Sequence, residues 1–226
     1  MVSPGSEQAH PAPREAHGAP GRPALLRFDG WITGIGTASG TRLVLGHWPR
    51  SPFGPFSDVM VETAGGHRVL LAPTRRTADF IAGTYGFDEV RVVPVGVRTD
   101  GAHWSVDVGP LLALRFTVGR RGPLGLLLRA VPGRVAASTG CATLFDPFAR
   151  LLGLRTRGSA GNGRYEWYGA RDLRRVTAAT AVYEGRDLGP VGPVVPPVRF
   201  GFGSTPRGPG QARVTTTVRV PAGQRF

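Results

Sequence analysis

Glycine and proline recur so often along this chain that long, uninterrupted helices are excluded. The 226 residues include 34 glycines and 21 prolines, which together make about a quarter of the chain. Glycine loses much conformational entropy inside a helix, and proline removes a backbone N–H and clashes with the preceding turn. The hydrophobic content of 41% is still sufficient for a buried core. The composition therefore favours many short strands joined by turns.

Two hairpins are indicated by apolar runs on either side of turn residues. Residues 58–63 and 67–72 flank Ala64-Gly65-Gly66, and residues 89–97 and 103–109 flank a turn that contains Asp100-Gly101. Tight hairpin turns need positive φ, which glycine adopts readily. Further strands are expected at 27–36, 41–48, 111–119, 164–170 and 176–185, with a closing pair at 198–204 and 212–220.

Three short segments have helical character. Residues 74–83 combine Thr74 as a candidate N-cap with an apolar face and a terminal glycine, Pro123 can open a helix at 123–131, and 143–152 is a third candidate. We therefore predict a mainly β (α+β) fold, an antiparallel, closed or half-closed β-barrel with two or three short helices.

The chain is expected to form one domain after a tail. Residues 1–24 are rich in proline, alanine and glycine without an apolar face, so we expect a disordered tail, with a single barrel-like domain at 25–226. The single cysteine, Cys141, cannot form an internal disulfide, which favours a reducing compartment. No apolar run reaches the ~20 residues of a membrane span, and the start lacks a secretory core. A cytoplasmic location is expected.

Arginine supplies all 28 basic residues, and lysine is absent. The chain therefore has no side-chain amine for an imine intermediate and no phosphate-binding lysine of the Walker type. The formal net charge of +13 comes entirely from residues 114–226, because arginines and acids balance in residues 1–113. Arginine-rich coding bias explains this excess as well as a functional basic surface does.

Two short segments carry a family resemblance. Gly54-Pro55-Phe56-Ser57-Asp58-Val59 resembles the Gly-Pro-Tyr-x-Glu-Val segment of the acetoacetate decarboxylase-like superfamily. About thirty residues further on, Thr84-Tyr85-Gly86-Phe87-Asp88-Glu89 resembles that family's Trp-Gly-Phe-Pro-Lys-Lys segment. The resemblance covers about residues 50–97 and implies a barrel with a central cavity.

The same resemblance places Asp58 at the family's active-site glutamate and Glu89 at its imine-forming lysine. Since no lysine is present, the resemblance implies a cavity without the family's decarboxylation mechanism. Two carboxylates in a partly apolar pocket can separate their pKa values and act as acid and base next to a carbonyl group. We therefore consider Asp58 and Glu89 as catalytic candidates, and Glu62 as a further inward acid. The alternative is that these acids pair with nearby arginines at the surface.

Substrate contacts are expected from Glu62, Tyr85 and Arg115. Arg115 shares a strand face with Ala113 and Thr117, and an inward guanidinium would require an anion such as a substrate carboxylate. The alternatives are that this face is exposed, so that Arg115 is an ordinary surface charge, or that Arg115 pairs with one of the acids named above. His47, His67 and His103 have no metal-ligand spacing, so neither a metal site nor a cofactor is expected.

The leading hypothesis is a domain that binds a small organic acid or carbonyl compound in a barrel cavity, with acid–base chemistry on that ligand as an option. The alternative is a non-catalytic module that binds RNA or another polyanion. Its support is the interleaving of aromatic residues with arginines in the C-terminal half (Arg150, Arg155, Arg157, Arg164, Tyr165, Trp167, Tyr168, Arg171, Arg174 and Arg175). A protein-interaction domain is a third option. The sequence does not specify an oligomeric state.

Overall fold

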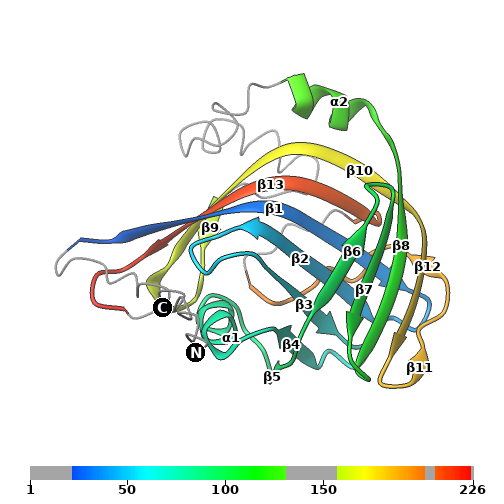
Figure 1. The fold of residues 1–226 in the computed structure, drawn as a ribbon, viewed down its shortest axis with the longest axis horizontal. Helices are drawn as coiled ribbons and strands as arrows, with labels where there is room; N and C mark the ends of the chain where they lie inside the picture. Colours follow the sequence, from blue (N-terminus) through cyan, green and yellow to red (C-terminus); the bar gives the residue numbers. More distant parts are fainter. Residues whose placement is uncertain (1–21, 131–156, 202–206, 225–226) are drawn as a thin grey trace, which may run out of the picture.

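The computed structural model describes residues 22–130, 157–201 and 207–224 and shows a mainly β protein (Figure 1). The first strand begins at Ala24, at the end of the predicted tail. Most of that tail (residues 1–21), the predicted helix at 143–152 and Cys141 lie outside the described residues. Neither α-helix of the described part has the length and apolar character needed to cross a membrane.

Strands make up most of the described chain. They are β1 (Ala24–Thr37), β2 (Arg42–Arg50), β3 (Phe56–Glu62), β4 (Arg68–Ala72), β5 (Glu89–Val92), β6 (Gly96–Thr99), β7 (His103–Val108), β8 (Leu112–Arg121), β9 (Arg157–Ser159), β10 (Tyr165–Tyr183), β11 (Arg186–Asp187), β12 (Val191–Gly192) and β13 (Gly210–Val220). The helices are α1 (Arg75–Ala82) and α2 (Pro123–Ala130), with a short 3₁₀ turn, η1, at Gly161–Gly163.

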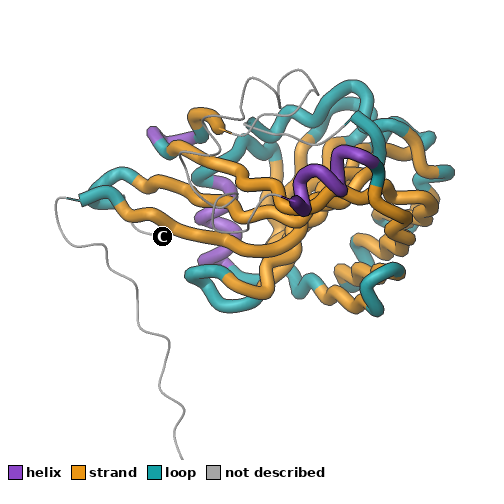
Figure 2. Tube along the Cα trace, turned by 90° about the horizontal axis from the view of Figure 1, so that it is seen from above, coloured by secondary structure: helices purple, strands orange, loops and turns teal. Residues whose placement is uncertain are grey.

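All these strands belong to one large, strongly curved sheet (Figures 1 and 2). Its main path runs β5-β4-β3-β2-β1-β13-β10-β8-β7-β6, and every neighbouring pair is antiparallel except β4 and β5, which are parallel. The two ends of this path, β5 and β6, are separated in sequence only by residues 93–95. The end of β5 therefore lies within about 14 Å of the start of β6. Among the described residues, no ladder joins these two strands.

Each face of the sheet carries its own hydrophobic cluster, because successive side chains of a strand point to opposite faces. In β4, Val69 and Leu71 belong to the first cluster, whereas Leu70 and Ala72 belong to the second. The first cluster continues into β7 and β8. The second cluster includes residues of β1, β2, β13 and α1. The sheet thus has a separate hydrophobic core on each of its two faces.

Helix α1 covers the second face and is positioned by its N-cap. As predicted, Thr74 caps the helix: its hydroxyl accepts a hydrogen bond from the Thr77 backbone N–H (3.1 Å), and the Thr77 hydroxyl accepts one from the Thr74 backbone N–H (3.2 Å). This capping box satisfies two backbone donors that the helix leaves open. Phe80 and Ile81 then pack into the second cluster.

Three strand predictions were wrong in detail. The expected single strand at 89–97 is interrupted, since Pro94 has no N–H to contribute to a ladder. The two strands expected within 164–185 are one continuous strand, β10, which accommodates its length through register shifts such as the one between Ala170 and Asp172. In the predicted closing pair, the described residues 198–201 form no strand, and β13 pairs instead with β1 and β10.

Candidate functional site

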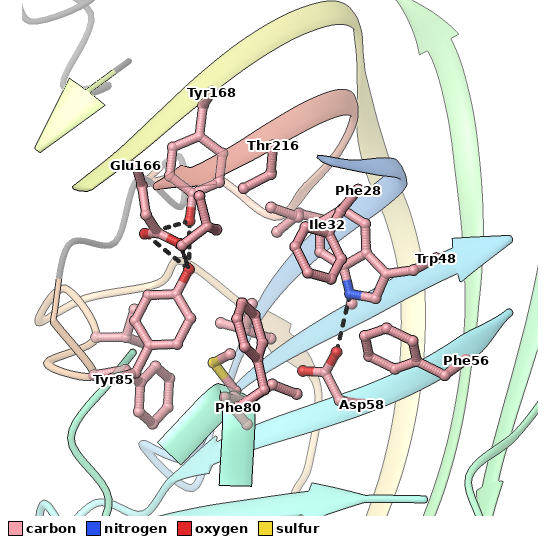
Figure 3. A pocket seen from close by; sticks show the side chains of 17 residues that line it. Phe28, Ile32, Trp48, Phe56, Asp58, Phe80, Tyr85, Glu166, Tyr168 and Thr216 are labelled. Carbon is pink, nitrogen blue, oxygen red and sulfur yellow. Dashed lines mark hydrogen bonds between the residues drawn. The ribbon is translucent and has the colours of Figure 1, made fainter. Parts of the chain in front are cut away.

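A pocket of about 80 Å³ lies on the second face of the sheet (Figure 3). Its walls come from five strands (β1, β2, β3, β10 and β13), from α1, and from the segments around Tyr85 and Phe200. Most of the lining is apolar and includes Phe28, Ile32, Trp48, Phe56, Phe80 and Phe200. Two carboxylic acids, Asp58 and Glu166, also line it. An apolar pocket with a few convergent polar groups is the usual form of a small-molecule site.

Asp58 projects from β3 into this pocket (Figure 3). The residue is 2% exposed, and its Oδ1 accepts a hydrogen bond from the indole N–H of Trp48 at 3.0 Å. Burial raises the pKa of Asp58 to about 7, and the Trp48 hydrogen bond opposes that rise. Gly46, opposite Asp58 on β2, makes room for this pair, because a Cβ atom there would lie 2.5 Å from Asp58 Oδ1.

Glu166 projects from β10 and is held by two tyrosines (Figure 3). The Tyr85 hydroxyl donates to its carboxylate, with oxygen distances of 2.8 and 3.0 Å, and the Tyr168 hydroxyl lies 3.4 Å away. The two hydroxyls are 2.7 Å apart. Burial raises the pKa of Glu166 to about 7, although the tyrosine hydrogen bonds and the charge of Arg164 lower it.

No cation lines this pocket among the described residues. Arg164 is the nearest candidate, but its guanidinium donates to the Phe80 carbonyl at 2.7 Å and to the Thr84 hydroxyl at 2.6 Å. It also packs over the Phe80 ring, 4.7 Å from the ring centre. Arg164 therefore lowers the pKa of Glu166 through its charge without lining the pocket. The pKa values of both Asp58 and Glu166 remain raised.

Thr216 is another polar residue of the lining. The Thr216 hydroxyl is buried and has no hydrogen-bond partner among the described residues. Thr216 lies opposite Tyr168 in the β13–β10 ladder. A buried hydroxyl without a partner is costly, and a bound polar ligand can supply the missing hydrogen bond.

The structure brings two of the five sequence-predicted site residues into the pocket. Asp58 and Tyr85, one from each of the segments that carry the family resemblance, both line it. Glu62 is also buried, as expected of an inward acid, but it is not part of the lining.

Glu62 instead binds two arginines. Its Oε1 lies 3.0 Å from Arg42 Nη2 and 2.9 Å from Arg199 Nε, and its Oε2 accepts the Arg199 backbone N–H at 2.7 Å. The last two contacts fix the segment that carries Val198 and Phe200, which do line the pocket. Glu62 therefore positions the pocket wall rather than contacting a ligand.

The prediction that Glu89 faces Asp58 was wrong. Glu89 lies on β5 at the edge of the sheet, its side chain is 38% exposed, and it pairs with Arg91 and His67. An edge strand leaves such a charge in solvent, where an ion pair stabilises it. The carboxylate that accompanies Asp58 is Glu166, which comes from a distant strand.

The inward position expected for Arg115 was also wrong. Strand alternation buries its neighbours Leu114 and Phe116 and leaves Arg115 exposed on β8. The face that Arg115 shares with Ala113 and Thr117 points away from the core. It lies outside the acid-lined pocket.

Sequence reasoning missed Glu166 as a site residue. The stretch Tyr165-Glu166-Trp167-Tyr168 was interpreted as part of an aromatic and basic face, but alternation buries Glu166 and Tyr168. Tyr165 and Trp167 form a separate ring pair 4.7 Å apart. The available signal was an acid flanked by aromatic residues and two positions away from a tyrosine, which places both on the same face of a strand. Arg150 and Arg155 of the predicted basic face lie outside the described residues.

No protein-family model matches the chain, and no curated protein matches it in sequence. In the described part of the chain, no group of three or more histidine, cysteine or acidic side chains lies close enough to hold a metal ion. The function is therefore inferred from the residues and geometry of the pocket.

The raised pKa of Asp58 predicts a specific dependence of stability on pH. Between pH 4 and pH 7 the folded protein keeps the Asp58 proton while the unfolded chain releases it, so stability falls as pH rises through this window. Asp58→Asn removes this penalty and should raise the free energy of unfolding at pH 8 by about 2–4 kcal/mol, with little effect at pH 4.

Urea unfolding of the wild type and of Asp58→Asn, at pH 4 and at pH 8, measures this difference in the free energy of unfolding. Asp107→Asn, the same change at an exposed position of β7, is the matched control and should leave the pH profile unchanged. An equal effect of Asp58→Asn at both pH values would contradict the raised pKa.

The Glu62 contacts predict a second stability effect. Glu62→Gln leaves the buried Arg42 without its counter-charge, so the free energy of unfolding should fall by about 3–5 kcal/mol. Glu89→Gln removes an acid of the same type from the exposed edge and should leave the unfolding midpoint nearly unchanged. Denaturant titration compares the two variants, and equal losses would show that Glu62 has no special structural role.

Proposed function

We propose that this protein binds a small, uncharged carbonyl compound in the pocket between Asp58 and Glu166 and moves protons on it by acid–base catalysis. One observation carries the proposal: two buried carboxylic acids, both with a pKa of about 7, line one apolar pocket. Acids whose pKa values lie near the working pH serve well as general acids and bases. Strongly shifted pKa values in a pocket are also typical of functional sites.

The chemistry of the lining favours a carbonyl compound over an organic acid. A ligand carboxylate would place a third acidic group beside Asp58 and Glu166 without an arginine in the lining to balance it. A neutral carbonyl oxygen, in contrast, can accept hydrogen bonds from a protonated carboxyl and from the Thr216 hydroxyl. An engineered apolar cavity of about 150 Å³ holds benzene, so about 80 Å³ suits a smaller molecule.

The hydrogen bonds assign different roles to the two acids. Glu166 accepts from Tyr85, and Tyr168 lies nearby, which favours its ionised form as the base. Asp58 receives the Trp48 hydrogen bond and serves as the acid. In enolisation, Glu166 takes a proton from the carbon next to the carbonyl, and the C–H electron pair forms the C=C bond. Asp58 gives its proton to the carbonyl oxygen, and exchange with water restores both acids.

We also propose that the chain is related to the acetoacetate decarboxylase-like family and that its sheet forms a half-closed barrel. The meeting of Asp58 and Tyr85 in one pocket supports the family resemblance, since each comes from one of the two matching segments. The three-residue link between the edge strands β5 and β6 supports the half-closed barrel. The absence of lysine excludes the family's imine chemistry, so proton transfer without decarboxylation is the activity that remains.

Hydrogen–deuterium exchange tests the activity. Butanone in deuterated water exchanges the hydrogens next to its carbonyl group when an enol forms, and proton NMR follows their loss. The protein should accelerate this exchange with a bell-shaped pH dependence centred near pH 7, since one acid must be protonated and the other ionised. Asp58→Asn and Glu166→Gln should each slow the exchange about 100-fold.

Binding is measured separately by saturation-transfer NMR with butanone and with acetate. Butanone should bind more tightly than acetate at pH 8, where both acids are largely ionised. Asp107→Asn should retain full exchange activity. Butanone binding without exchange would refute the catalytic role, and tighter binding of acetate would refute the choice of an uncharged ligand.

A further inference from the structure

A second cavity, of about 490 Å³, is lined by arginines and is distinct from the acid-lined pocket. Its basic residues are Arg121, Arg129, Arg171, Arg174 and Arg213, and its aromatic residues include Trp31 and Trp104. We call it the arginine cleft. Its volume is in the range typical of small-molecule sites.

The arginine cleft and the acid-lined pocket lie on opposite faces of the sheet. In β1, Trp31 lines the cleft, and the next residue, Ile32, lines the acid-lined pocket. In β2, His47 lines the cleft and Trp48 lines the pocket. Successive side chains of a strand point to opposite faces, so the two cavities open on different sides of the same strands.

The cleft has more positive than negative charge. Arg121 pairs with Asp172 at 2.8 Å, and Arg171 pairs with Asp29 at 2.8 Å. Arg129, Arg174 and Arg213 form no ion pair with a described carboxylate. Within the described part of the chain, three guanidinium groups of the cleft thus have no anionic partner.

The geometry of these arginines is restricted by their surroundings. Arg174 Nε donates to the Gly119 carbonyl at 3.0 Å, and the Arg213 guanidinium packs over the Trp31 ring, 4.7 Å from its centre. Held guanidinium groups lose less side-chain entropy when they bind a ligand. The cleft is thus partly preorganised.

Two buried donors at the cleft have no acceptor among the described residues. They are the indole N–H of Trp104, a residue 4% exposed, and the Nε–H of Arg171. Both residues line the cleft. His47 adds no fixed charge, because burial lowers the pKa of its imidazole. Unused donors beside excess positive charge fit a ligand that supplies only acceptors.

We infer that the arginine cleft binds a compact small-molecule anion that carries two or three negative charges on phosphate or carboxylate oxygens. Guanidinium groups match both kinds of oxyanion through paired hydrogen bonds. A small ligand is favoured over RNA, because Arg164 and Tyr168 of the expected nucleic-acid face are buried in the interior. This site does not depend on the function proposed for Asp58 and Glu166.

Isothermal titration calorimetry with pyrophosphate and with citrate tests the inference and distinguishes phosphate from carboxylate ligands. At least one of the two should bind, and binding should weaken as salt rises. Arg213→Gln and Arg129→Gln should each lower the affinity about five- to tenfold. Arg75→Gln removes the same charge from an exposed position on α1, at the other face, and should change it less than about twofold.

Two further measurements make the outcome decisive. Asp58→Asn should bind the anion as the wild type does, which separates this site from the acid-lined pocket. Thermal unfolding confirms that each arginine variant is folded, and Arg129→Gln, on the exposed side of α2, serves if Arg213→Gln does not fold. The inference is overturned if neither anion binds, if Arg75→Gln weakens binding as much as Arg213→Gln, or if only single-stranded RNA binds.

Discussion

The alternation of side chains across one continuous sheet organises this molecule. Each central strand contributes to both faces, so neighbouring residues serve different interiors, as Ile32 and Trp31 do in β1. This constraint places two carboxylic acids on the face covered by α1 and four strand arginines (Arg121, Arg171, Arg174 and Arg213) on the other, where Arg129 of α2 joins them. The two sets of charges are separated by the sheet itself and do not neutralise each other.

Because the acids are kept apart from the arginines, their ionisation lowers the stability of the folded protein. A rise of the Asp58 pKa from 3.8 to about 7 corresponds to about 4 kcal/mol of lost stability at neutral pH. A lining arginine would remove that cost, and Arg164 is close enough to influence Glu166, yet its guanidinium is bound to Phe80 and Thr84. Sites that keep unfavourable local arrangements are often those with a function.

The wall of the acid-lined pocket depends on Glu62, a buried acid that, unlike Asp58 and Glu166, is paired with arginines. Glu62 is 0% exposed, but two arginines and a backbone N–H satisfy its carboxylate. Its contacts hold the segment that carries Phe200 over the pocket, where a second contact joins the Gly86 N–H to the Phe200 carbonyl at 2.6 Å. The buried acids thus divide into one that is paired and structural and two that line the pocket with raised pKa values and no lining cation among the described residues.

The features predicted well from the sequence are local ones. The capped helix at Thr74 and the hairpin turn at Ala64-Gly65-Gly66 follow from residues adjacent in the chain, and Asp58 follows a short motif. Long-range features were less accessible. Nothing local shows that Glu89 lies at a sheet edge, because that depends on which strand β4 pairs with next. The approach of Glu166 to Tyr85, 81 residues apart in sequence, depends on the whole sheet.

The central claim is that Asp58 and Glu166 stay largely protonated in the folded protein until the pH approaches neutrality. Carbon-13 NMR of the aspartate and glutamate carboxyl carbons, assigned with Asp58→Asn and Glu166→Gln, measures this directly. The structure predicts two carboxyl signals that titrate with apparent pKa values near 7. If both groups are already ionised at pH 5, the acid–base account of this pocket is wrong.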